Sequence, residues 1–204
     1  HFLPVTPSGQ YLQETLLVRL RRQLDVPALT PLHRIDRETA GVVLFAKQAE
    51  HCAAYHGMFA GGDVAKTYEA IAPFDPALNF PRTHASVLVE GEHFMQMREA
   101  DETEAAGRVP NTRTGIELLE TRGAQARYRL RPVTGKRHQL RVHMAALGLP
   151  ILGDRIYPVL LPQGGDEPGN PLRLLAQGLA FVDPVTGQDR RFTSVRTLQF
   201  PPGA

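Results

Sequence analysis

Leucines recur at helical spacing near the start of the chain. Leu12, Leu16, Leu17 and Leu20 lie within Gln10–Leu24, and three arginines fall on its other faces, so this range is expected to form an amphipathic helix. The same reasoning predicts two more helices: Gln48–Ala60, stopped by Gly61-Gly62, and Arg137–Leu147, capped by Gly148.

Runs rich in β-branched and aromatic residues predict strands between these helices. One prediction is a single buried strand over Val42–Lys47. The turn Thr121–Ala124 predicts a hairpin, and Gln163–Pro171 predicts a loop rather than a linker. The remaining expected strands are Val64–Ala72, Ala85–Glu90, Gly115–Glu120, Gln125–Arg131, Leu172–Leu175, Leu179–Val182 and Arg191–Thr193. Many strands with few helices favour an α+β fold with a mainly antiparallel sheet.

Length and composition set outer limits. The 204 residues suit a single domain over 1–204, and no apolar run approaches the ~18 residues of a membrane span. There is no signal peptide, and Cys52 is the only cysteine, so we expect a cytoplasmic protein without an internal disulfide. The opening His1-Phe2-Leu3-Pro4-Val5 is no natural start, and we expect an N-terminal piece carrying a sheet strand to precede it.

Charge is distributed unevenly, although the net charge is only +2. No Asp or Glu occurs from Thr121 to Gly153, yet seven cations fall there: Arg122, Arg127, Arg129, Arg131, Lys136, Arg137 and Arg141. Such an uncompensated block suggests a phosphate-facing surface that binds RNA or DNA. A solvated strand face explains the same block equally well.

The run from Pro31 to Gly41 holds the most informative carboxylate. Asp36 lies between Arg34 and Arg37, just before an apolar stretch. Positive neighbours favour the ionised carboxylate, which makes Asp36 a candidate nucleophile. A salt bridge within the loop is the other interpretation.

Two further stretches carry polar groups on expected elements. In Arg131–His143, the turn Thr134-Gly135 leads into a helix whose Arg137 and Arg141, four residues apart, share a face. Leu140, Met144 and Leu147 of that helix should pack on the sheet. In Ala65–Ala70, strand alternation sends Lys66 and Tyr68 to one face, where a tyrosine could stack on a base.

Together these stretches resemble the RluA family of pseudouridine synthases. Pro31–Gly41 is similar to the family's H-R-L-D-R-x-T-S-G signature, with Ile35 and Ala40 as departures. Thr134–His143 resembles T-G-R-x-H-Q-[LI]-R-V-H, with Lys136 where Arg is commoner, and Lys66–Ala70 resembles K-x-Y-x-A. Pro150–Tyr157 resembles P-I-x-G-D-x-x-Y, whose Asp154 we interpret as structural or RNA-positioning. The resemblance implies the pseudouridine synthase fold: a bent mixed sheet, mainly antiparallel, with flanking helices and a central catalytic cleft.

The resemblance also implies roles for individual residues. Asp36 would be the nucleophile, Arg141 its partner, and Tyr68 the active-site tyrosine that stacks on uracil. Because the target uridine must leave its helix or loop, Arg34 would fill the gap it leaves, while Arg37 braces the loop and His33 helps to fix it. The full set of expected RNA contacts is Arg34, His33, Lys136, Arg137, His138 and Arg122.

The implied reaction changes no oxidation state, so we expect no cofactor, and no metal site is expected from the histidine spacings. The expected partner is ribosomal or transfer RNA. We expect the protein to be a monomer without an S4-like RNA-binding domain. Two other classes remain as alternatives. One is a non-catalytic RNA-binding protein, and the other is a hydrolase in which Asp36 and Glu38 cleave a glycosidic bond.

Overall fold

The computed structural model describes the chain except residues 8, 10, 12, 163–165 and 203–204. The described chain forms two compact units, the first comprising 1–66 and 176–196, the second 67–175 and 197–204. Two strands, β4 (Ala65–Pro73) and β10 (Leu174–Val182), run from one unit into the other. The expectation of one catalytic domain over 1–204 stays a prediction.

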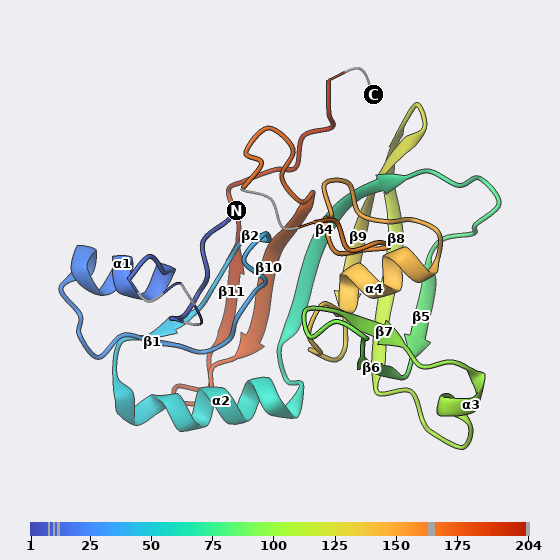
Figure 1. The fold of residues 1–204 in the computed structure, drawn as a ribbon. Coiled ribbons are helices and arrows are strands. Elements are labelled where there is room, and N and C mark those ends of the chain that lie inside the picture. Colours follow the sequence, from blue (N-terminus) through green and yellow to red (C-terminus); the bar gives the residue numbers. More distant parts are fainter. Residues whose placement is uncertain (8, 10, 12, 163–165, 203–204) are drawn as a thin grey trace. The chain divides into compact units, whose positions relative to one another are not determined.

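The first unit combines helices with short strands (Figure 1). β1 (Thr30–Pro31) pairs antiparallel with β3 (Phe45–Ala46), and the part of β10 from Ala176 onward pairs antiparallel with β11 (Asp189–Thr193). β2 (Ala40–Gly41) lies beside β10. The helices are α1 (Leu16–Leu24), the 3-10 turn η1 (Ala49–His51) and α2 (Cys52–Gly61). A core of Met58, Val64, Leu179 and Phe181 holds α2 against β10.

Local signals explain where these helices begin and end. The hydroxyl of Thr15 accepts the N–H of Val18 and caps α1, which is therefore shorter than the expected Gln10–Leu24, of which Gln10 and Leu12 lie outside the described residues. Gly62 ends α2 with φ of 83°, as predicted from the glycine pair. The predicted single strand over Val42–Lys47 is wrong, because the extended pairing is split between β2 and β3.

The second unit is built on four antiparallel strands in the order β4, β9, β8, β5. β5 spans Arg82–Ser86, β8 Thr112–Arg122 and β9 Gln125–Pro132. A second small sheet pairs β6 (Leu88–Glu90) with β7 (Met97–Glu99), and α3 (Glu102–Ala105) follows it. The predicted hairpin is confirmed, with β8 and β9 as its two long arms (Figure 1).

The hairpin carries a β-bulge. Leu118 pairs with Tyr128, but the next pair is Glu120 with Arg127, so Leu119 is an extra residue on β8. In a regular strand Glu117 and Glu120, three residues apart, would point to opposite faces of the sheet. The extra residue shifts the alternation by one, so that both side chains lie on the same face. Both glutamates therefore stand opposite arginines of β9.

Helix α4 (Gln139–Ala146) lies against this sheet (Figure 1). Leu140 and Met144 are buried with Ile116 and Leu130, and Leu147 packs on the same cluster, which confirms the predicted apolar face. The helix begins two residues later than expected, with His138 before it at φ of 55°. Arg137 therefore lies in the preceding turn, and the prediction that it shares a helix face with Arg141 is wrong.

Among the described residues, no helix is both long and apolar enough to cross a lipid bilayer.

Candidate active site

Asp36 lies in the loop between β1 and β2, in the first unit. Its backbone carbonyl accepts the N–H of Thr39 at 2.9 Å, which closes a turn directly after it. The residue is half-buried, whereas Arg34 is exposed. The loop therefore presents Asp36 in a fixed turn and leaves Arg34 open to a partner.

His33 fixes the start of this loop. Its Nε2 accepts the backbone N–H of Leu44 at 3.1 Å, and its ring stacks on Phe59 with the centroids 4.8 Å apart. Burial lowers the pKa of His33 to about 4, and Lys66 contributes in the same direction while a backbone bond at Arg34 opposes it. The imidazole is neutral at pH 7 and braces the loop, whereas its expected RNA contact stays a prediction.

Arg37 turns back onto the protein. Its guanidinium lies over the rings of Tyr11, at 4.9 Å from the centroid, and Phe2, at 5.7 Å, and contacts Glu38 at 3.6 Å. These contacts support the expected role of Arg37 in bracing the loop.

The downstream end of the loop is fixed by a close backbone approach. Gly41 has φ of 122°, and a Cβ at this position would lie 2.2 Å from the carbonyl oxygen of Ala176. The next residue, Val42, donates its N–H to that same oxygen at 3.0 Å. Glycine is required at this position both for the dihedral angle and for the space.

Tyr68 lies on β4 in the second unit, paired with Leu130 of β9. It is half-buried and packs against the main apolar cluster of that unit. Its neighbour on the same face by alternation, Lys66, belongs to the first unit, and burial lowers the pKa of its ammonium.

Arg141 forms a buried, bidentate ion pair with Asp154. Nε of Arg141 donates to Oδ2 at 2.8 Å and Nη2 donates to Oδ1 at 2.7 Å, and each side chain is 1% exposed. The sequence pointed to Asp154 only through the Pro150–Tyr157 motif and did not identify it as the partner of Arg141. Asp36 and Arg141 belong to different units, so their predicted pairing stays a prediction.

Tyr157 completes this cluster. Its ring lies 5.4 Å from the Arg141 guanidinium, and its hydroxyl accepts the N–H of Met97 at 2.7 Å. Nδ1 of His138 lies 2.9 Å from the same hydroxyl. His138 is thus tied into the second unit, and its expected contact with RNA stays a prediction.

Six of the seven cations in this block have an acidic partner, so its charge is partly compensated in three dimensions, contrary to the prediction of an uncompensated block. Glu117 contacts Arg129 at 3.1 Å and Arg131 at 2.9 Å, both across the hairpin. The remaining pairs are Arg127–Glu120 at 3.3 Å, Arg122–Glu120 at 4.0 Å, Arg137–Glu90 at 2.6 Å and Arg141–Asp154 at 2.7 Å. The acidic partners precede or follow the acid-free segment in sequence, so the count along the chain overstated the free positive charge.

Among the residues that the structure describes, one group of side chains has the spacing of a metal site: His84, Glu99 and His143, whose candidate ligand atoms lie within 4.8 Å of one another. Nε2 of His84 is 2.6 Å from the Glu99 carboxylate. Burial alone would raise the pKa of Glu99, but bonds from His84 and Ser86 outweigh it and hold that pKa below its ordinary value.

Hydrogen bonds determine the tautomer of His143. The Thr112 hydroxyl donates to the carbonyl of Ser86 at 2.7 Å, so it can only accept from His143 Nε2, 3.0 Å away. Gln139 donates to the Thr114 hydroxyl at 3.0 Å, which leaves the hydroxyl proton for His143 Nδ1 at 2.9 Å. Nε2 of His143 therefore carries a proton and Nδ1 accepts one, so neither nitrogen can ligate a metal ion while these hydrogen bonds are in place.

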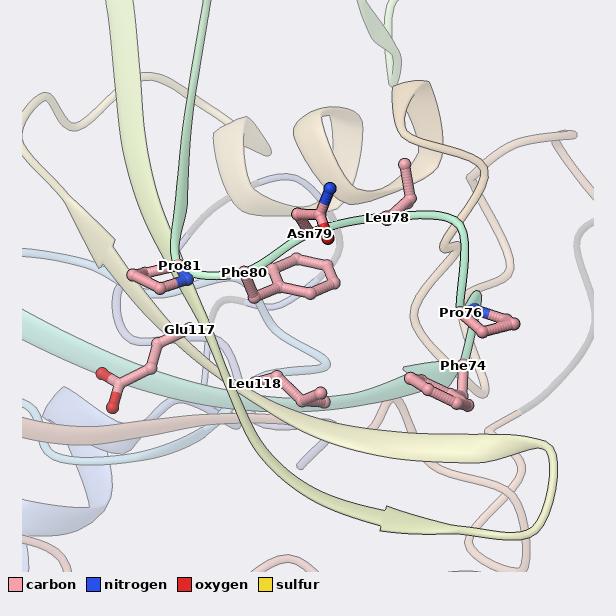
Figure 2. Close-up of a pocket in the computed structure, with 8 residues that line it drawn as sticks. All are labelled: Phe74, Pro76, Leu78, Asn79, Phe80, Pro81, Glu117 and Leu118. Atoms are coloured by element: carbon pink, nitrogen blue, oxygen red, sulfur yellow. The ribbon is translucent and has the colours of Figure 1, made fainter.

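A shallow pocket opens on the second unit between the β4–β5 loop and β8. Figure 2 shows Leu118 and Phe80 within it, with the carboxylate of Glu117 pointing away from the apolar side chains. The other lining residues are Phe74, Pro76, Leu78, Asn79 and Pro81. The lining combines polar and apolar surface, and its carboxylate, that of Glu117, is already paired with two arginines.

Curated proteins with similar sequences are pseudouridine synthases. The chain is 33% identical over 180 residues to the tRNA pseudouridine synthase C of Vibrio vulnificus, covering 78% of this chain and 69% of that protein. It is 29% identical to the dual-specificity RNA pseudouridine synthase RluA of Haemophilus influenzae, covering 80% of this chain and 72% of that one. The chain spans only 40% of the length of RNA pseudouridine synthase 7 of Arabidopsis thaliana, to which it is 29% identical.

Solved structures give the fold. Human RNA pseudouridylate synthase domain containing 4 superposes with a TM-score of 0.71 at 24% identity, covering 98% of this chain and 83% of that one. Human RNA pseudouridylate synthase domain containing 1 superposes with the same TM-score of 0.71 at 22% identity, covering 89% of this chain and 74% of that one. The predicted α+β pseudouridine synthase fold is confirmed. With the RNA pseudouridylate synthase family model matching residues 1–146 as well, the chain belongs to that family.

Proposed function

We propose that the protein isomerises uridine in RNA to pseudouridine, with Asp36 as nucleophile. The observation that carries the proposal is the family match over residues 1–146, because Asp36, Tyr68 and Arg141 all fall within it and each stands in a motif that resembles one of the family's. The held turn at Asp36 and the fixed guanidinium of Arg141 support it further.

The reaction breaks the bond from uracil N1 to ribose C1′, turns the base, and joins C5 of the base to C1′. Asp36 attacks either C1′ or the base, and a carboxylate can do both. The proton on C5 then leaves and N1 gains one, so the atoms balance without any oxidant or energy source. Tyr68 stacks on the uracil and assists removal of the C5 proton, while Arg141 orients the Asp36 carboxylate.

RNA must release the target base before Asp36 can reach it. Unstacking costs a few kcal/mol. Arg34 is the residue proposed to occupy the gap, and its exposure supports that role. The other proposed RNA contacts are His33, Lys136, Arg137, His138 and Arg122, among which Arg137 and Arg122 would exchange an acidic partner for phosphate.

Transfer or ribosomal RNA is the proposed substrate class. The names of the two bacterial relatives support it, since one is a tRNA pseudouridine synthase and the other a dual-specificity RNA pseudouridine synthase. We further propose that the enzyme acts as a monomer in the cytoplasm. Mapping pseudouridines in cellular RNA with and without the gene would identify the target uridine.

Tritium release from RNA labelled at C5 of uridine tests the activity. Asp36→Asn is expected to abolish release while RNA affinity changes little. Asp25→Asn is the matched control, because Asp25 sits in a left-handed helix cap where asparagine is equally tolerated. Full turnover in Asp36→Asn would refute the nucleophile assignment, and free uracil as the product would indicate a hydrolase instead.

A further inference from the structure

We propose that Asp154 is a positioning residue for the isomerisation, acting through Arg141. This inference rests on the proposed function and names a residue that the proposed catalytic set does not include. Asp154 follows α4 by a short loop, so a carboxylate close in sequence to Arg141 orients it from within the same unit.

The geometry of the pair restricts Arg141 to one orientation. Asp154 binds Nε and Nη2 together, at 2.8 and 2.7 Å, which fixes the plane of the guanidinium as a single bond would not. Both side chains are 1% exposed, so water does not compete for these bonds. Any further acceptor must approach from the remaining N–H groups, along directions set by Asp154.

Asp154 is itself held in place. Its Oδ1 also accepts the backbone N–H groups of Ile156 at 2.8 Å and Tyr157 at 3.0 Å. The turn that carries it begins at Gly153, with φ of 76°, where a Cβ would lie 2.3 Å from the carbonyl oxygen of Pro171. The carboxylate is therefore part of a rigid turn.

Tyr157 restrains the guanidinium from a second direction. Its ring lies 5.4 Å from the guanidinium, and the bond from Met97 N–H to its hydroxyl fixes the ring. Arg141 is thus oriented by a carboxylate along its edge and by an aromatic ring across its face.

The pair also changes what Arg141 can offer to a nucleophile. Asp154 balances its charge at contact distance, so Arg141 acts on a second anion mainly through directed hydrogen bonds rather than as an unbalanced charge. A lysine at position 141 would carry the same charge but would not donate hydrogen bonds in the fixed directions of a planar guanidinium. Loss of Asp154 should therefore slow the chemical step more than it weakens RNA binding.

The test is single-turnover tritium release at saturating enzyme from tRNA labelled with [5-³H]uridine, using the full chain. Asp154→Asn is expected to lower the rate constant at least 100-fold, with RNA affinity within threefold of wild type. In an Arg141→Lys background, the same change is expected to add less than threefold. Ile116→Ala, a destabilising core change in the same unit, is the control and should keep the rate within threefold once folded.

Two outcomes would overturn the inference while leaving the proposed function intact: an unchanged rate in Asp154→Asn, or a full additional loss in the Arg141→Lys background. A wild-type enzyme that releases no tritium from tRNA or rRNA would instead count against the proposed function. If Asp154→Asn does not fold, Asp154→Glu, which keeps the charge but displaces the carboxylate, decides. A rate constant lowered at least tenfold with unchanged RNA affinity supports the inference, and an unchanged rate constant overturns it.

Discussion

His33 lies three residues before Asp36, the proposed nucleophile, and its Nε2 accepts the backbone N–H of Leu44 at 3.1 Å. Accepting that bond requires an unprotonated nitrogen, and burial lowers the pKa of His33 to about 4. Protonation of His33 would break this bond, so the stability of the loop that carries Asp36 depends on pH through a histidine outside the proposed catalytic set.

The first prediction concerns this linkage. An unfolded histidine titrates near 6.5, so between about pH 6.5 and 4 the unfolded chain binds the extra proton and the folded chain does not. Stability is full above pH 6.5 and falls as pH drops through this window. His33→Gln, which can still accept the Leu44 N–H, should flatten the slope by up to about 1.4 kcal/mol per pH unit. Chemical denaturation across pH 4–7 measures it, and equal slopes for both proteins would contradict it.

His143 contributes a slope of the same sign. Burial, followed by the charge on His84, lowers its pKa to about 4 as well. The His33→Gln variant should therefore retain part of the pH dependence of the wild-type protein.

Gly41→Ala should destabilise the protein by several kcal/mol, because the new Cβ would meet the Ala176 oxygen at 2.2 Å in a left-handed backbone. Gly57→Ala is the matched control. Gly57 lies within α2 and a Cβ there meets nothing within 4 Å, so this change should stabilise by up to about 1 kcal/mol. Urea denaturation of both variants measures the contrast, and a stable Gly41→Ala would show that the loop end can shift.

Arg34 and Arg37 should behave as opposites. Arg37→Ala removes the contacts with Tyr11 and Phe2 and should cost roughly 0.5–2 kcal/mol of stability. Arg34→Ala, at an exposed position, should change stability by less than about 0.5 kcal/mol and reduce RNA affinity. Denaturation and filter binding, run on both variants, separate the roles. Equal loss of RNA affinity in folded samples of the two would refute the distinction.

Glu117→Gln should strengthen RNA binding. The change keeps the side-chain shape but releases Arg129 and Arg131 from their shared carboxylate. If the hairpin faces RNA, the slope of log affinity against log salt should steepen by about 1–2. Glu104→Gln, which releases Arg98 outside the hairpin, is the control. An unchanged slope would show that these arginines face away from RNA.

The sequence predicted those features of the fold that depend on residues close together in the chain, such as a helix face and a helix end. The apolar face of Leu140, Met144 and Leu147 follows from helical spacing alone, and the Gly62 stop follows from backbone freedom at one position. The strand predicted over Val42–Lys47 failed because the backbone changes partner within it: the N–H of Val42 bonds to Ala176 of β10, whereas Phe45 and Ala46 pair with β1.

Charge pairing could not be predicted in this way, because it depends on strand register. Glu117 and Glu120 precede the acid-free segment yet neutralise arginines of β9, and the bulge that aligns Glu120 leaves no clear trace in the sequence. Arg141 likewise finds Asp154 just after the end of that segment. Whether Asp36 meets Tyr68 and Arg141 remains a prediction from the family motifs.

Because of the bulge at Leu119, this hairpin should tolerate the deletion of one residue, which in a regular strand would turn the following side chains to the opposite face. Deleting Leu119 would remove the extra residue and leave Glu117 two positions from the other glutamate, still on one face by ordinary alternation. A strand one residue shorter could therefore keep the same order of opposite charges across the hairpin.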